Sequence, residues 1–180
     1  MQIIGVRHGQ SQYNLLGLCN DDPAAAVDLT PLGAEQAATA AHRLQTLHVD
    51  AIYCSPLLRA SRTARIIGEA IGVDVVDEPR LSDIRSGCES QPVAHYLSAI
   101  AHDPVHAKVG DGESLAEYRQ RVEGFLHELS QLAFGCVLLV AHEETLRIFQ
   151  SVYAGESLAA VAGRSFDNCR PYFFDLPSGN

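Results

Sequence analysis

Arginine and histidine side chains follow three separate apolar runs of this sequence, and both residue types can bind an oxyanion. Arg7 and His8 come directly after one run, His142 follows a second, and Arg59 lies in the first turn of a helix expected after a third. In open α/β sheets, ligands bind outside the carboxyl ends of the strands, so we expect these four side chains to converge on one crevice. Arginine holds anionic oxygens in pairs of hydrogen bonds, and a helix N-terminus adds partial positive charge. The set therefore predicts a site for an anion, most naturally a phosphate group.

Short apolar runs alternate with amphipathic stretches along the chain, which is typical of α/β proteins. We predict strands at residues 3–6, 51–54, 73–76, 137–140 and 172–176. We predict helices from residue 31 to about 47 and at residues 56–71, 92–102, 114–132 and 145–152. The pattern favours a three-layer α/β/α fold with a mostly parallel central sheet and a small helical and loop lobe over the site. Residues 1–180 are expected to form one domain, with residues 83–113 as an inserted lobe that faces the substrate.

Three helix starts carry local signals. Thr30 followed by Pro31 pairs a good N-cap residue with proline at the first helical position. The pair at residues 55–56, serine and proline, repeats that signal. Ser114 and Glu117 are three residues apart and can each satisfy the other's free backbone donor, which predicts a capping box.

The composition is that of an ordinary globular protein, with 47% apolar and 19% charged residues. A net charge of −9 disfavours nucleic acid and anionic lipid as partners. The first residues show no basic segment followed by a long apolar stretch, so we expect no secretory signal and a cytoplasmic location. The five cysteines are odd in number and lack the spacing of zinc ligands, so we expect reduced thiols and no metal site.

Five short motifs occur in the order in which a known family has them. They are RHGQS with an asparagine three residues on, LTxxGxxQA, SPLxRAxxTA, GES with a following arginine, and VxH, at residues 7–14, 29–37, 55–64, 112–121 and 140–142. Through these motifs, which extend over nearly the whole chain, the sequence resembles the histidine phosphatase superfamily. That superfamily includes the cofactor-dependent phosphoglycerate mutases.

The resemblance implies a role for each residue of the predicted phosphate site. His8 would be the nucleophile that forms a phosphohistidine, while Arg7, Arg59 and His142 hold the phosphoryl oxygens and Asn14 assists. No metal or other cofactor is implied, because the guanidinium groups supply the positive charge that phosphoryl transfer needs. The attacking nitrogen of His8 must be neutral, so we expect its other ring nitrogen to donate to a backbone carbonyl near Gly9.

The sequence leaves the proton donor open. Many family members have glutamate in an LxE segment after the third strand, where this chain has Asp83, whose side chain is one methylene shorter. Glu143 follows His142 directly, at a place where this branch usually has glycine and another branch has its acid. Both residues are candidate catalytic acids, and Glu89 or the lack of a dedicated acid is the remaining alternative. A general acid contributes typically 10²–10⁴-fold to the rate, so the assignment matters.

The preferred function is metal-independent hydrolysis of small phosphorylated metabolites through a phosphohistidine. Related mutases generally carry longer insertions that enclose a bisphosphate, and this chain has little room for them. A phosphoglycerate mutase or bisphosphate phosphatase is one alternative. A catalytically weakened protein with a phosphate-binding or regulatory role is another alternative, because the family's usual acid site is altered. The expected partner is a small phosphorylated substrate, with no nucleic acid or membrane, and the sequence leaves a homodimer open.

Overall fold

A five-stranded sheet forms the centre of the computed structural model, which describes residues 1–175. The strands are β1 (Gln2–Arg7), β2 (Ala51–Cys54), β3 (Val75–Asp77), β4 (Cys136–Ala141) and β5 (Pro171–Asp175). Their order in the sheet is β3-β2-β4-β1-β5, and only β5 runs antiparallel to its neighbour. The mostly parallel sheet that the sequence predicts is therefore confirmed; Leu176, the last residue of the predicted fifth strand, lies outside the described residues.

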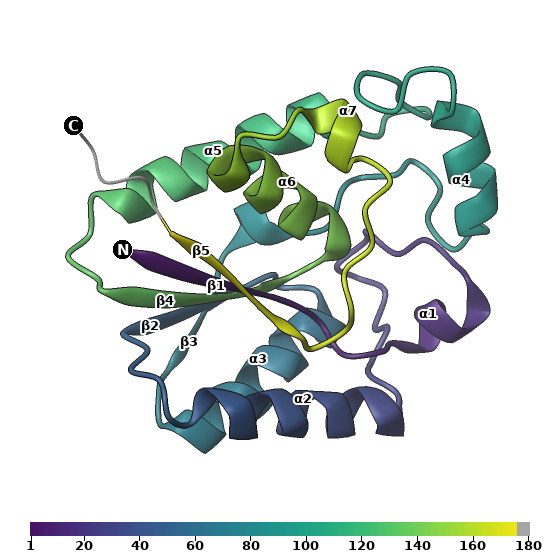
Figure 1. The fold of residues 1–180 in the computed structure, drawn as a ribbon. Coiled ribbons are helices and arrows are strands. Elements are labelled where there is room, and N and C mark those ends of the chain that lie inside the picture. The colour runs from purple at the N-terminus through teal and green to yellow at the C-terminus, as the bar shows by residue number, and fades with distance from the viewer. Residues whose placement is uncertain (176–180) are drawn as a thin grey trace.

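Helices cover both faces of the sheet (Figure 1). One face carries α2 (Pro31–Leu44) and α3 (Leu58–Ile71), and the other carries α5 (Leu115–Ser130) and α6 (Glu143–Ala154). Strand β4 alternates between the two cores: Val137 and Leu139 belong to the cluster under α5 and α6, whereas Leu138 and Val140 belong to the cluster under α2 and α3. A strand that is buried on both faces reads as a continuous apolar run, which is why this one was readily predicted.

The register of the parallel strands brings three polar side chains to one level. Arg7, the last residue of β1, pairs with Ala141 of β4, and the next backbone N–H, that of His8, donates to the Ala141 carbonyl at 2.9 Å. On the other side of β4, the backbone N–H of Ser55 donates to the Val140 carbonyl at 3.0 Å. The sheet's hydrogen bonds thus continue one residue beyond the strands and fix where the functional side chains begin.

Two glycines of the motifs let the loop after β1 approach the start of α2. A Cβ atom at Gly9 would lie 2.3 Å from the carbonyl oxygen of Gly33, and one at Gly33 would lie 2.1 Å from that of Gln10. Thr63 holds the same loop from α3, because its hydroxyl accepts from the Gly9 N–H at 3.0 Å and donates to the Arg59 carbonyl at 2.8 Å. These contacts link the first three motifs in space.

Two of the three predicted helix starts are correct. Thr30 accepts from the Gly33 N–H with Pro31 at the first position of α2, and Ser114 and Glu117 form the capping box of α5. The prediction for residues 55–56 is wrong, because α3 begins at Leu58 after a backbone-extended Leu57 that provides no side-chain cap. A serine hydroxyl two residues before the N-cap cannot reach the free donors of the first turn, and that of Ser55 accepts from the Leu57 N–H instead.

Other helix and strand boundaries differ from the predicted ones because capping of the neighbouring helix ends determines them. Strand β3 begins at Val75 and not at residue 73, because Gly72 ends α3 in the left-handed conformation and the Val73 N–H still bonds to the Gly68 carbonyl. Helix α6 begins at Glu143, two residues earlier than predicted, with His142 as its N-cap. Three short elements were not predicted: α1 (Gln12–Leu16), the 3-10 turn Pro79–Leu81 and α7 (Leu158–Val161).

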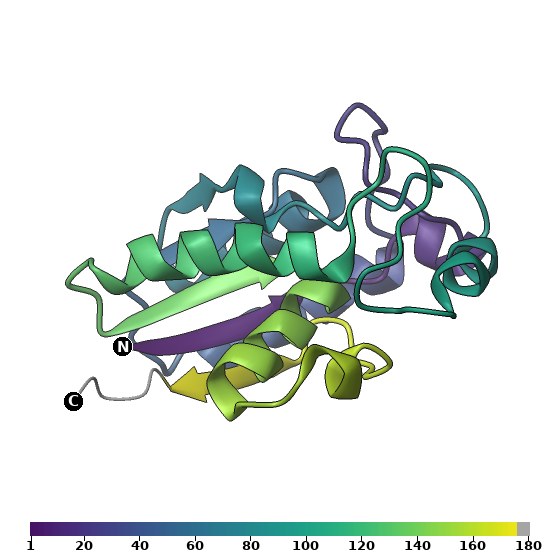
Figure 2. The ribbon, with the colours of Figure 1, turned by 90° about the horizontal axis from the view of Figure 1, so that it is seen from above.

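A small lobe lies beyond the carboxyl ends of the parallel strands (Figures 1 and 2). It contains α1, the loop that follows, and α4 (Val93–Ile100) with its flanking loops. The backbone N–H of Cys19 donates to the Gln91 carbonyl at 2.8 Å, which ties the two segments together. Cys19, Cys88, Tyr96 and Ile100 form an apolar cluster of their own inside the lobe. The lobe is therefore held by its own small core.

All five cysteines are free thiols, and four of them are buried. Within residues 1–175, no helix is both long enough and apolar enough to cross a bilayer.

Candidate active site

His8 is held as a neutral imidazole with one nitrogen free of its proton. The side chain is buried, and its Nδ1 lies 2.7 Å from the Gly9 carbonyl oxygen, which can only accept. Nδ1 therefore carries the proton and Nε2 carries the lone pair. Burial lowers the pKa of His8 well below its ordinary value, and the charge of Arg59 lowers it further. The expected bond to a carbonyl near Gly9 is thus present in the structure.

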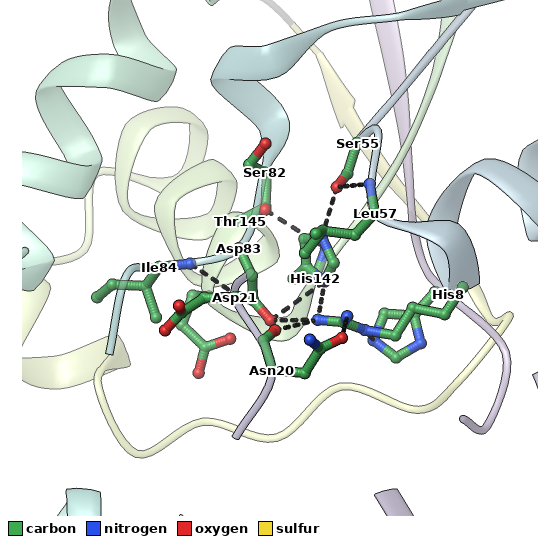
Figure 3. A network of polar contacts seen from close by, with 12 residues as sticks. His8, Asn20, Asp21, Ser55, Leu57, Ser82, Asp83, Ile84, His142 and Thr145 are labelled. Atoms are coloured by element: carbon green, nitrogen blue, oxygen red, sulfur yellow. Dashed lines mark hydrogen bonds and ion pairs between the residues drawn. The ribbon is translucent and has the colours of Figure 1, made fainter. Parts of the chain in front are cut away.

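His142 lies beside His8, with the ring centroids 5.2 Å apart. Its Nε2 is 2.8 Å from the Ser55 hydroxyl, and its Nδ1 is 3.2 Å from a guanidinium nitrogen of Arg59 and 3.3 Å from the Asp83 carboxylate. Figure 3 shows these contacts around the ring. Burial, and then the charge of Arg59, lowers the pKa of His142 well below its ordinary value. Two neutral imidazoles therefore face one cationic guanidinium group.

Arg59 connects the two histidines to the lobe. Its Nε donates to Nε2 of His8 at 3.0 Å, and its Nη2 donates to the Asp83 carboxylate at 2.8 Å. Its Nη1 donates to the side-chain oxygen of Asn20, and Nη2 also reaches the Asn20 carbonyl at 2.9 Å. The side chain is buried in the first turn of α3, so the helix that begins after β2 fixes its position.

Arg7 is anchored at one end of its guanidinium group. Its Nη1 donates to the Glu143 carboxylate at 2.9 Å and to the Phe166 carbonyl at 2.8 Å. Its Nε is buried and has no hydrogen-bond partner among the described residues. Buried polar atoms in folded proteins nearly always have a partner, so this donor is open to an acceptor such as a water molecule or a ligand oxygen.

Asp83 is a carboxyl group whose pKa is raised above its ordinary value. Burial raises its pKa to about 8, and the negative charge of Glu144 acts in the same direction, while Arg59 opposes the shift. One carboxylate oxygen contacts Arg59 and His142, and the other accepts from the Ile84 N–H at 3.0 Å. A carboxylic acid with this pKa, beside the phosphate-binding side chains, is suited to donate a proton to a leaving group.

Glu143 has a different environment from Asp83. One of its oxygens accepts from Arg7 and from the Phe166 N–H, both at 2.9 Å, and the other accepts from Arg147 at 3.3 Å. Three donors, two of them cationic, thus engage both oxygens of this carboxylate. The geometry therefore favours Glu143 as the residue that positions Arg7 and favours Asp83 as the acid.

Glu89, the remaining candidate acid, holds the loop after α1. Its carboxylate accepts from the Asn20 side chain at 3.1 Å and from the backbone N–H groups of Asp21 and Asp22 at 2.7 and 3.0 Å. Asp21 in turn accepts from the Ser86 hydroxyl at 2.6 Å. The loop and the segment before α4 are therefore joined by carboxylates bonded to neutral donors.

Apart from Glu89, the predicted site residues line one cavity of about 150 Å³. It contains both predicted groups, the catalytic and the phosphate-binding residues: Arg7, His8, Asn14, Arg59, Asp83, His142 and Glu143. The amide oxygen of Asn14 accepts from the Ser11 N–H in the capping box of α1, at 3.0 Å. Side chains that lie up to 136 residues apart in the sequence, Arg7 and Glu143, therefore meet at one place.

Sequence reasoning missed several residues of the site. Ser55 follows β2 directly, so the rule that located Arg7 and His142 at strand ends could also have found it. Asn20 and Asp21 lie in a loop with no periodic pattern, and no signal in the sequence pointed to their contacts. Glu144 stands in the first turn of α6, which was predicted to begin later, so its position beside the cavity was not expected.

Comparisons with known proteins agree with the fold and the motifs. The family model described as "Histidine phosphatase superfamily (branch 1)" matches residues 3–179. Phosphoserine phosphatase 1 of Hydrogenobacter thermophilus is 32% identical over 179 residues, covering 93% of this chain and 83% of that protein. A probable phosphoglycerate mutase GpmB of Enterobacter is 30% identical over 181 residues, covering 94% and 82%.

A solved structure extends the likeness to three dimensions. The alpha-ribazole phosphatase of Shigella flexneri superimposes with a TM-score of 0.88 at 27% identity, covering 99% of this chain and 92% of that one. The family predicted from the five motifs is therefore confirmed. The chain belongs to the histidine phosphatase superfamily, branch 1, and is a phosphatase of that family.

Proposed function

We propose that the protein hydrolyses phosphomonoesters of small metabolites through a phosphohistidine on Nε2 of His8. The observation that carries the proposal is the bond between Nδ1 of His8 and the Gly9 carbonyl, which leaves the lone pair on Nε2 beside Arg59. A covalent intermediate divides the hydrolysis into two easier steps. The names of the relatives, which include phosphatases for phosphoserine and alpha-ribazole phosphate esters, support a small substrate.

The phosphoryl group would be held by the cationic side chains around the cavity. Its oxygens would accept from Arg7, whose Nε has no partner within residues 1–175, and from Arg59, with His142 and Asn14 completing the set. Arg59 donates to Nε2 of His8 in the structure, so a phosphoryl oxygen must take over that donor before His8 can attack. Phosphoryl transfer depends mainly on positioning and on stabilising charge on the equatorial oxygens, and these residues supply both.

The two steps balance with Asp83 as acid and then base. The lone pair of His8 Nε2 forms the N–P bond while the P–O bond to the alcohol breaks, and Asp83 gives its proton to the departing oxygen. A water molecule then attacks phosphorus, the N–P bond breaks and its electron pair returns to Nε2, and the Asp83 carboxylate takes the proton from that water. A pKa of about 8 keeps Asp83 protonated for the first step at neutral pH.

We place this reaction in the cytoplasm. The support is the set of five free cysteines, four of them buried, because thiols persist where the cellular environment is reducing.

The deciding experiment is hydrolysis of an aryl phosphate in the presence of a chelator, with wild type and His8→Ala compared from about pH 4 to 9. We expect turnover that resists the chelator in wild type and falls at least about 1,000-fold in His8→Ala. A matched control is His127→Ala, which changes an exposed histidine on α5. Enzyme denatured in alkaline detergent should carry a phosphoryl group that is stable in alkali and labile in acid, in wild type only. Activity in His8→Ala equal to wild type would refute the proposal, and a requirement for a bisphosphate would favour mutase activity.

A further inference from the structure

A second, mostly apolar cavity adjoins the phosphate site. It has a volume of about 290 Å³, compared with about 150 Å³ for the cavity that contains His8. Ile84, Tyr96, Leu97 and Glu144 line both cavities, so the two share a wall. Ligand sites in proteins combine a few polar groups with a larger apolar surface, and the two cavities together have that form.

The second cavity lies between the lobe and a helix from the far end of the chain. Ile100, Ala101 and Pro104 line it from α4 and the following loop, and Ala159 and Ala162 line it from α7 and its C-cap. Figure 1 shows α4 and α7 at the same end of the molecule, beyond the carboxyl ends of the parallel strands. Small alanine side chains on one wall leave the space open to a ligand.

We propose that this cavity binds the alcohol part of the substrate, and that the substrate is a phosphomonoester with an uncharged apolar body about the size of a phenyl ring on a short chain. The inference rests on the proposed function, because it places the phosphoryl group against His8. The phosphate cavity is the smaller one, so a body of this size extends past Tyr96 and Leu97 into the apolar space.

The charges at the shared wall exclude a second anionic group. Glu144 lines both cavities, and Glu143 lines the phosphate cavity beside it. Arg147 also reaches the apolar cavity, but its three nitrogens already donate to Glu143, to Glu144 and to the Arg164 carbonyl. Glu144 is the carboxylate that a second anionic group would meet in the apolar cavity, and no unengaged cation among the residues lining that cavity offsets its repulsion of a carboxylate or a second phosphate on the substrate.

The test measures binding apart from catalysis. Calorimetric titration of His8→Ala, which cannot form the phosphohistidine, compares ethyl phosphate, 4-phenylbutyl phosphate and butyl phosphate with a terminal carboxylate. Burying a phenyl-sized apolar group is expected to tighten Kd about 10- to 100-fold relative to ethyl phosphate. The carboxylate derivative should bind no more tightly than ethyl phosphate.

Two paired variants locate the gain. In the His8→Ala background, Ala159→Phe fills the apolar cavity and should abolish the advantage of the phenyl group, while the Kd of ethyl phosphate stays the same. Ala160→Phe places the same side chain on the exposed neighbouring position, which does not line the cavity, and should keep the advantage. Ala101→Phe fills the cavity from the opposite wall and replaces Ala159→Phe if that variant does not fold.

Each outcome decides the inference. A gain of less than about 3-fold, equal losses in Ala159→Phe and Ala160→Phe, or no phosphate-ester binding at all would overturn it. Tighter binding of the phenyl ester that only the cavity-filling variants remove would establish it. If wild type hydrolyses none of these esters while that binding pattern holds, the hydrolytic function fails and the ligand class stands.

Discussion

The strand ends and the lobe above them contribute to the site in different ways. At the strand ends, His8 and Ser55 follow strands whose backbone hydrogen bonds continue into them, with both cores of the sheet packed behind. In the lobe, Asn20, Glu89 and Asp21 are held by side-chain hydrogen bonds between two loops. The sheet therefore fixes the reacting groups through the backbone, whereas the lobe shapes the space around the substrate through contacts that another sequence can replace.

Asp83 stands where the two regions meet, and its substitution should give the largest change among the predictions below. Asp83→Asn keeps the shape but removes the proton, so we expect kcat for an alkyl phosphate to fall about 10²- to 10⁴-fold. An aryl phosphate, whose leaving group needs little protonation, should lose far less. The measurement is kcat for both substrates in wild type and variant. Equal losses for the two would remove Asp83 from the role of acid.

The same residue should set how stability depends on pH above neutrality. The folded-state pKa of Asp83, about 8, is higher than its ordinary value of 3.8. The contribution of Asp83 to the free energy of unfolding is therefore fully present below about pH 4 and is lost as the pH rises through 8. His8 and His142 have lowered pKa values, so their opposite contribution is complete above about pH 6.5. As the pH rises from 6.5 to 8, the free energy of unfolding of wild type should therefore fall by about 2 kcal/mol relative to that of Asp83→Asn.

Urea unfolding of both proteins at several pH values measures this difference. The relevant quantity is the change in the free energy of unfolding between the two proteins, since other titrating groups cancel in it. A difference that stays constant from pH 6.5 to 8 would mean that Asp83 is ionised in the folded protein.

Substitution of Glu143 perturbs the strand-end region and leaves the proposed acid, Asp83, in place. Glu143→Gln weakens the hold on Arg7, so we expect kcat/KM to fall about 10-fold, the value of a charge-assisted hydrogen bond. The loss should be the same for alkyl and aryl phosphates, and the alkaline limb of the pH profile should not move. A loss that depends on the leaving group would instead make Glu143 the acid.

Substitution of Glu89 perturbs the lobe, and its effect on the kinetics should be the smallest of these changes. Glu89→Gln removes the charge that holds the Asn20 loop, and a partly exposed contact of this kind is worth about 1 kcal/mol or less. We expect KM to rise a few-fold with kcat unchanged, as measured by steady-state kinetics on an alkyl phosphate. If kcat falls as much as in Asp83→Asn, the lobe positions the reacting groups and the comparison between the two regions is wrong.

Much of the strand-end region was predictable because it rests on backbone patterns. Apolar runs located β1 and β4, and Arg7 and His142 followed from where those runs end. The choice between Asp83 and Glu143 was not predictable, since it depends on which carboxyl group lies near Glu144 and which one meets Arg7 and Arg147. These are contacts between distant segments, and no local spacing encodes them.

The lobe was harder for the same reason. Helix α4 was found from its apolar spacing, but α1 and α7 have five and four residues, too few to show a helical period. Asn20 reaches Arg59 only after the loop has folded over the sheet. Where the sequence failed, the structure depends on polar side chains that meet across loops.

The bond between Arg59 and Nε2 of His8 has a consequence for how the empty enzyme survives. A lone pair that already accepts an N–H is shielded from protons and from stray electrophiles in the cell. Only a ligand whose oxygens attract the guanidinium group exposes that nitrogen, so the substrate's own charge makes the lone pair of the nucleophile available. In the resting protein the nucleophile is therefore unreactive, and alkylating agents without an anionic group should not modify His8.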